Sequence, residues 1–69
     1  MIMRILLQDR QSHLYFKGIN EWTAEIEQAT DFRQVVSAID YVRAVKVPNL
    51  DVVMNFGDPK YDVRLNVTK

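Results

Sequence analysis

The sequence predicts an α+β domain in which one helix packs on one face of a four-stranded sheet. One amphipathic segment, residues 31–46, has the apolar spacing of a helix. Two strand-like runs precede this segment and two follow it, so the expected order is strand, strand, helix, strand, strand (ββαββ). Because an isolated helix of this length is only marginally stable in water, its apolar stripe needs a sheet to pack against.

The predicted helix covers residues 31–46, where apolar side chains recur every three or four positions. Asp31 is the expected N-cap because its carboxylate can accept hydrogen bonds from the first unpaired amides, and Thr30 is the alternative cap. Pro48 is expected to end the helix because proline biases the residue before it toward an extended conformation. The stripe follows Val35, Ile39, Val42 and Lys46, with Ala38 and Val45 on its flank.

Alternation of apolar and polar residues predicts four strands. Each pair is joined by a short run of turn-forming residues, 9–12 and 57–60, so two hairpins are expected. The alternation assigns Ile5, Phe16 and Leu65 to the face that packs on the helix. The four strands are predicted at residues 3–8, 13–17, 50–56 and 61–68.

Residues 18–30 show no clear period, although so long a loop is unusual in a small domain and some local structure is expected there. Trp22 is the largest apolar side chain in the chain and is expected to cover an edge of the core. Thr23 offers a start resembling a capping box, which makes a helical turn possible after it.

The strand order depends on how the helix crosses the sheet. If both hairpins stay paired and the helix crosses back over the sheet, the first and last strands lie side by side and parallel. This β-grasp-like order, 2-1-4-3 in chain numbering, is favoured, and a fully antiparallel sheet is the alternative.

Length and composition restrict the classes of protein that fit. Sixty-nine residues form one domain, residues 1–69, and the absence of cysteine excludes disulfides and thiolate metal sites. Nine basic and nine acidic residues cancel, which argues against strong attraction to nucleic acid or an anionic membrane. No apolar run approaches the roughly 20 residues of a membrane span, and the first seven residues are too short for a signal peptide. A cytoplasmic protein is therefore expected.

The chemistry-bearing residues do not form a recognisable catalytic or metal-binding set. Asp9, Ser12 and His13 are the residue types of a nucleophilic triad, but neighbouring side chains on a strand point to opposite faces. A single histidine and scattered carboxylates do not make a tetrahedral metal site. Gly18 and Gly57 are too far apart to build a phosphate loop. We expect no catalytic residue, metal or cofactor, and hence a non-enzymatic protein.

A pattern in the middle of the chain resembles one found in small bacterial single-domain proteins of unassigned function. It consists of Glu21-Trp22-Thr23, then Ala29 and Phe32, and then Ala38 within the helix. The resemblance implies a bacterial origin and a single domain. It implies no activity and transfers no functional residue.

The sheet face turned away from the helix is the most promising surface for function. Its apolar centre is surrounded by basic groups, as in a protein interface with a polar rim. We expect it to bind another protein or a second copy of the chain. The alternative is weak RNA binding by base stacking on the aromatic residue, and an enzyme is the least favoured reading. The candidate interaction surface comprises Leu6, Tyr15 and Val53 with Arg4, Lys17 and Arg64.

Overall fold

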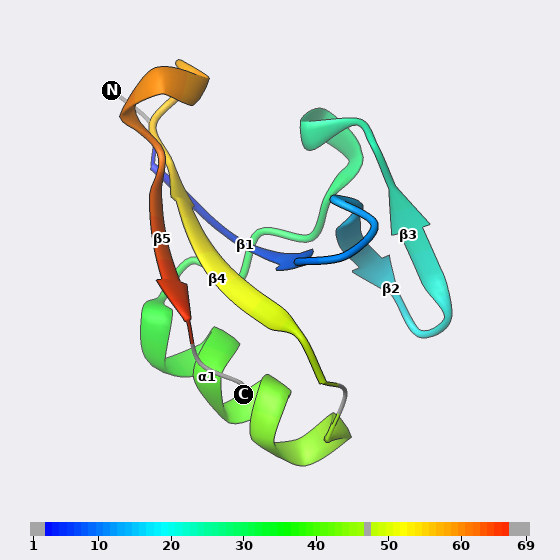
Figure 1. Cartoon of the computed structure of the whole chain (residues 1–69). Coiled ribbons are helices and arrows are strands. Elements are labelled where there is room, and N and C mark those ends of the chain that lie inside the picture. The colour runs from blue at the N-terminus through cyan, green and yellow to red at the C-terminus, as the bar shows by residue number, and fades with distance from the viewer. Residues whose placement is uncertain (1–2, 47, 67–69) are drawn as a thin grey trace.

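The computed structural model describes residues 3–46 and 48–66, and within this range it confirms an α+β fold with one α-helix (Figure 1). Two short 3₁₀ turns, η1 (Ile26–Gln28) and η2 (Pro59–Tyr61), precede the helix and the last strand. The helix is α1 (Val35–Val45), and the strands are β1 (Arg4–Asp9), β2 (Tyr15–Gly18), β3 (Glu21–Thr23), β4 (Leu50–Asn55) and β5 (Val63–Asn66).

The described strands form one open sheet in the order β3-β2-β1-β4-β5, and every neighbouring pair is antiparallel. The predicted β-grasp-like order with parallel first and last strands is therefore wrong. In its place β1 pairs with β4 along its whole length, from Arg4↔Asn55 to Asp9↔Leu50.

The reason for this order lies at the start of the helix. The N–H of Phe32 donates to the carbonyl of Ile5 at 2.8 Å, which holds the chain entering α1 beside the beginning of β1. An 11-residue helix is about 16 Å long, close to the length of a six-residue strand. The helix thus ends near the end of β1, where the Arg10 N–H donates to the Asn49 carbonyl at 2.7 Å. Because Asn49 is bonded directly to the end of β1, the strand that follows lies next to β1, in the place that the predicted order gave to the last strand.

The fifth strand, β3, lies in the segment for which the sequence shows no period. Phe16 pairs with Trp22 and Tyr15 with Thr23, and the register shifts at Gly18. Asn20 has a φ of 60°, a left-handed conformation that asparagine tolerates in tight turns. A three-residue strand is too short for alternation to identify, and its pairing with β2 is what makes it extended.

The helix begins at Val35, four residues after the predicted start, and its N-cap is Gln34. Asp31 is not the N-cap. Its Oδ1 accepts hydrogen bonds from the N–H of Arg33 at 2.8 Å and from the N–H of Ile5 at 3.0 Å. Arg33 has a φ of 68°, which turns the chain before the helix can start. Asp31 therefore joins the helix entrance to β1.

The last strand begins at Val63, two residues later than predicted, because residues 59–61 form η2. Gly57, with a φ of 96°, supplies the change of direction after β4. Val67 and Thr68, the final residues of the predicted last strand, lie outside the described residues.

Residues 30–32 cross the sheet through the space between β1 and β2. Thr30 donates from its N–H to the carbonyl of Phe16 at 3.0 Å and from its hydroxyl to the carbonyl of Lys17 at 2.6 Å. On the other side, Asp31 and Phe32 bond to the backbone of Ile5. The crossing segment thus takes the place of strand pairing where β1 and β2 diverge, and it carries the chain from one sheet face to the other.

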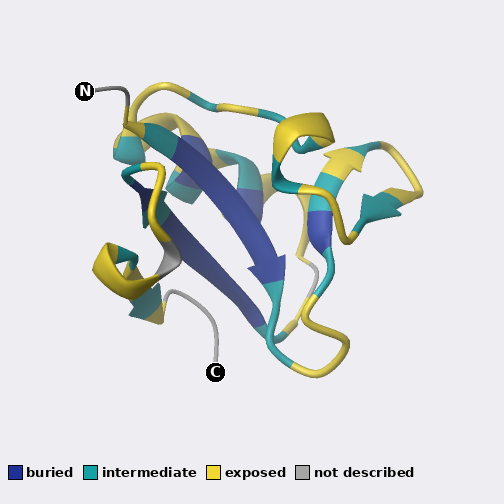
Figure 2. Ribbon diagram, turned by 90° about the horizontal axis from the view of Figure 1, so that it is seen from above, coloured by how far each residue is buried: buried dark blue, intermediate teal, exposed yellow. Residues whose placement is uncertain are grey.

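Both faces of the sheet are consequently covered around β1 and β4, which Figure 2 shows as the buried centre of the molecule. The assignment of Ile5, Phe16 and Leu65 to the helix side is confirmed. On the opposite face, Leu6, Tyr15 and Val53 form a second buried cluster beneath Ile26 and Ala29. The core on the helix side is built from Ile5, Leu7, Leu50 and Val52 of the sheet with Ala38 and Val42 of α1.

Removing the Asp31 carboxylate should destabilise the protein because it leaves the Ile5 N–H without its acceptor. We expect Asp31→Ala to lower the free energy of unfolding by about 1–2 kcal/mol, measured by urea denaturation. Asp31→Asn keeps an acceptor oxygen at the same place and should recover most of the loss. Equal losses in the two variants would contradict the proposed role of this oxygen.

Candidate functional site

The apolar part of the surface expected from the sequence is not exposed. Leu6 and Val53 are 0% exposed and Tyr15 is 8% exposed, because Ile26 and Ala29 pack on them. The expectation that these three side chains form an open patch is therefore wrong. Alternation indicates which face a side chain occupies, but not that residues 24–30 fold back over that face.

Two of the three basic residues of the expected surface bond to this cover. Arg4 donates from Nη1 to the carbonyl of Ile26 at 3.0 Å, and Lys17 donates from Nζ to Oε1 of Gln28 at 3.3 Å. Arg64, further along the same face, donates to the side-chain oxygen of Gln8. Two of the three thus hold η1 in place. A nucleic-acid base could stack on Tyr15 only after η1 had been displaced.

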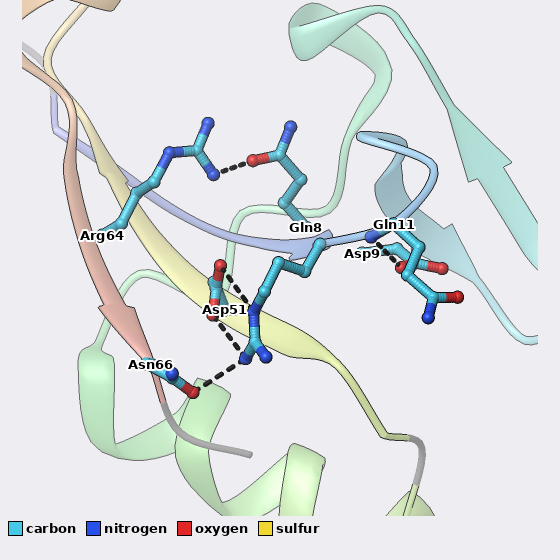
Figure 3. A network of polar contacts seen from close by, with 7 residues as sticks. Gln8, Asp9, Gln11, Asp51, Arg64 and Asn66 are labelled. Carbon is cyan, nitrogen blue, oxygen red and sulfur yellow. Dashed lines mark hydrogen bonds and ion pairs between the residues drawn. The ribbon is translucent and has the colours of Figure 1, made fainter. Parts of the chain in front are cut away.

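Beyond η1, the same face carries a network of polar side chains that joins β1, β4 and β5 (Figure 3). The guanidinium of Arg10 donates from Nη2 to Asp51 Oδ1 at 2.9 Å and to Asn66 Oδ1 at 2.7 Å. Asp51 is buried, as is Gln8, whose amide donates to the carbonyl of His13 at 2.9 Å. Buried polar groups need such partners, so this network helps to fix the sheet.

The residues of the possible triad serve a turn. The Asp9 carboxylate accepts from the N–H of Gln11 at 2.8 Å, and the Ser12 hydroxyl accepts from the N–H of Leu14 at 3.2 Å. His13 has a φ of 65° and an exposed side chain. Among the described residues, no group of three or more metal-ligating side chains comes together.

A concavity on the helix side of the sheet is the candidate functional site, here called the hairpin groove. It has a volume of about 690 Å³. The groove lies between the β2–β3 hairpin and the C-terminal half of α1. Its lining residues are Asp9, Phe16, Ile19, Asn20, Trp22, Tyr41, Val45 and Leu50.

The groove exists because one helix cannot cover this sheet. A helix is roughly 10 Å wide, whereas the axes of the outer strands of a five-stranded sheet are about 19 Å apart. In this fold α1 packs on β1 and β4, and the β2–β3 hairpin extends beyond it (Figure 1). The helix-side face of the hairpin is therefore only partly covered.

Aromatic side chains form the floor of the hairpin groove. The ring of Phe16 contacts Trp22 edge to face, with centroids 5.8 Å apart, and Tyr41 at 4.9 Å. Phe32 lies 5.9 Å from Phe16 and 5.5 Å from Tyr41. The prediction that Trp22 covers an edge of the core is confirmed, since it packs against the helix-side cluster. The packed rings give the groove a rigid apolar floor.

Two exposed apolar side chains stand at the rim. Ile19, at the tip of the hairpin, is 81% exposed, and Val45 lies in the last turn of α1 with its side chain also exposed. Asp9 and Asn20 add polar groups to the lining. The arrangement can hold an apolar group on the aromatic floor with a cation near Asp9. In the sequence, the only signal for this site is Ile19, an apolar residue between the turn-forming residues Gly18 and Asn20. Ile19 belongs to no periodic pattern, so sequence reasoning missed it.

The four apolar residues of the pattern singled out in the middle of the sequence all pack against the core of the fold. Trp22, Phe32 and Ala38 belong to the helix-side core, and Ala29 packs on the opposite cluster. Packing thus accounts for these residue types without a shared activity.

Within the described residues, no helix has the length and apolar character required to cross a membrane. Comparison with protein families, curated proteins and solved structures finds no match for the chain.

Proposed function

We propose that the chain is a small, non-enzymatic, cytoplasmic protein-binding module, and that the hairpin groove is its binding surface. The observation that carries this proposal is the exposure of Ile19 beside a floor of packed aromatic rings. Burying a large apolar side chain contributes roughly 1.5–3 kcal/mol, so leaving Ile19 in water at a hairpin tip forgoes that stabilisation. A partner that covers Ile19 would recover it.

The shape of the groove favours a protein segment over an enclosed small molecule. Small-molecule sites usually bury most of the ligand surface, whereas this groove has the largely exposed side chain of Ile19 in its lining. A protruding isoleucine next to a hollow resembles the anchor-and-pocket arrangement at the centre of protein interfaces.

The lining indicates the chemistry of the partner segment. Trp22 and Tyr41 provide apolar ring surfaces for one bulky aliphatic or aromatic side chain. The carboxylate of Asp9 lies in the same lining and favours a neighbouring lysine or arginine. We therefore infer a partner segment with a bulky apolar residue close to a basic one.

Selection from a random peptide library displayed on phage tests this proposal. Peptides that bind the wild-type chain should be enriched in a bulky apolar residue next to lysine or arginine. The substitutions Ile19→Ser and Val45→Ser should each weaken binding of the best peptide about tenfold, as expected for loss of an apolar anchor. Val36→Ser is the matched control, because Val36 is exposed on α1 and does not line the groove.

Two results would contradict the proposal. One is the absence of any enriched sequence after selection against the folded protein. The other is a set of peptides that bind the Ile19→Ser and Val45→Ser variants as tightly as the wild type, because the binding surface would then lie elsewhere.

A further inference from the structure

The outer edge of β5 is a second candidate interaction surface, at the opposite end of the sheet from the hairpin groove. In the strand order β3-β2-β1-β4-β5, β5 is the last strand among the described residues. Two apolar side chains are exposed beside this edge, Tyr61 and Val63, and Val63 is 42% exposed. Unpaired edge strands readily accept another strand, so the backbone groups along β5 decide what can bind there.

The direction of these backbone groups follows from bonds made by β1. In an antiparallel sheet, successive residues direct their N–H and C=O to opposite neighbours. Ile5 bonds to Asp31 and Phe32, and the Asp9 N–H donates to Leu14, all on the side away from β4. The alternate residues of β1, such as Leu6, therefore make the bonds to β4.

The same alternation continues across β4 to β5. Val53, which pairs with Leu6, directs its groups toward β1, so Val52 and Met54 direct theirs toward β5. Their partners in β5, Leu65 and Val63, consequently direct their backbone N–H and C=O toward β4. Arg64, between them, presents its N–H and C=O to the outer edge.

We propose that two copies of this chain associate through antiparallel pairing of their β5 edges about a two-fold axis at Val63. In this register Asp62, the residue directly before β5, lies opposite Arg64 of the other copy and exchanges both backbone hydrogen bonds with it. Val63 lies opposite its own equivalent in a non-hydrogen-bonded pair, where side chains approach most closely. One pairing thus combines backbone bonds, two opposite-charge pairs and an apolar contact.

Charge complementarity selects this register from its neighbours. Two edges can pair only where the backbone N–H and C=O of both opposing residues point outward. The register can therefore shift only in steps that again place two such residues opposite each other. One neighbouring register places Arg64 opposite Arg64, and the other places Asp62 opposite Asp62. Like charges directly opposite each other destabilise a strand pair, and both alternatives are therefore disfavoured.

The side chains can make these pairs without losing their present contacts. Asp62 accepts from Asn55 Nδ2 through Oδ1 at 2.9 Å, and a carboxylate has capacity for further hydrogen bonds. Arg64 contacts Gln8 through Nη1, and a guanidinium carries five N–H donors. The proposed dimer therefore adds contacts to the existing network on this face.

Charge reversal at the two positions tests the proposal. Sedimentation velocity and amide chemical shifts, recorded up to millimolar concentration, should show reversible dimerisation of the wild type with shifts concentrated on residues 62–66. Asp62→Arg and Arg64→Asp should each weaken dimerisation about tenfold or more, because each places like charges opposite each other. Arg33→Asp, which makes the same charge change at an exposed position far from β5 in the sequence, should leave it unchanged.

A mixture of the two variants is the decisive sample. In the mixed dimer the two carboxylates of the Arg64→Asp chain face the two guanidinium groups of the Asp62→Arg chain. The two variants should therefore associate with each other although neither associates with itself. Circular dichroism of each variant verifies that it is folded. A wild type that stays monomeric at millimolar concentration, or a mixture that forms no heterodimer from folded chains, would overturn the proposal.

Discussion

Replacing Val53 with aspartate is expected to remove much or all of the folding stability of the protein. Val53 is 0% exposed and packs with Leu6 and Tyr15 beneath Ile26 and Ala29. The substitution removes an apolar side chain and places an unpaired carboxylate in its position, at a cost of about 4 kcal/mol or more. A domain of this size has a total stability of roughly 3–10 kcal/mol, so the loss takes much or all of it.

Circular dichroism and urea denaturation measure this effect, with Val36→Asp as the control. Val36 is 66% exposed and lies in the first turn of α1, where a negative charge suits the helix dipole. This variant should keep wild-type stability within about 0.5 kcal/mol. A Val53→Asp protein that stays folded with native stability would show that the face opposite the helix is open, as the sequence alone had suggested.

Truncating Phe16 to alanine is expected to cost about 3 kcal/mol of unfolding free energy and to deform the hairpin groove. The Phe16 ring contacts the rings of Trp22, Phe32 and Tyr41, which come from three different segments. Loss of a phenylalanine side chain from packed surroundings typically costs about 3–5 kcal/mol, and partial exposure of Phe16 places the expectation at the lower end. Thermal or urea unfolding gives the change in stability, and Trp22 fluorescence reports on the groove.

Phe16→Leu is the matched variant, because it keeps an apolar side chain of similar reach. It should lose less than half as much stability while removing the ring contacts. If Phe16→Ala were as stable as the wild type, the aromatic floor would not be a rigid unit and the hairpin groove would lose its structural basis.

The faces of the strands could be predicted from the sequence because alternation is a local property of an extended chain. Ile5 and Leu6 are adjacent and both apolar, yet the pattern of their neighbours assigns them to opposite faces, and the structure agrees. The turn at Gly57 depends on an equally local feature, and the packing of Trp22 against the core agrees with the large size of its apolar side chain.

The candidate sites could not be predicted in the same way. Tyr15 has the pattern of an outward-facing aromatic residue, and only the path of residues 24–30 covers it. In the sequence, Ile19 is a single apolar residue within a turn. Only the pairing of β3 with β2 places it beside Tyr41 and Val45 in the lining of the groove.

By itself, the sequence determined that one helix packs on a sheet and which side chains lie on each face of that sheet. Backbone geometry alone sets the repeat of three to four residues in a helix and of two residues in a strand. The tertiary structure decided the strand order, the covering of the second face and the position of the groove. The groove depends on a sheet that is wider than the one helix packed on it. The strand order and the covering of the second face depend on residues 30–32 crossing between β1 and β2, where Asp31 bonds to Ile5, a residue 26 positions earlier in the chain. Hydrogen bonds over such separations depend on the assembled fold, and no local pattern in the chain encodes them.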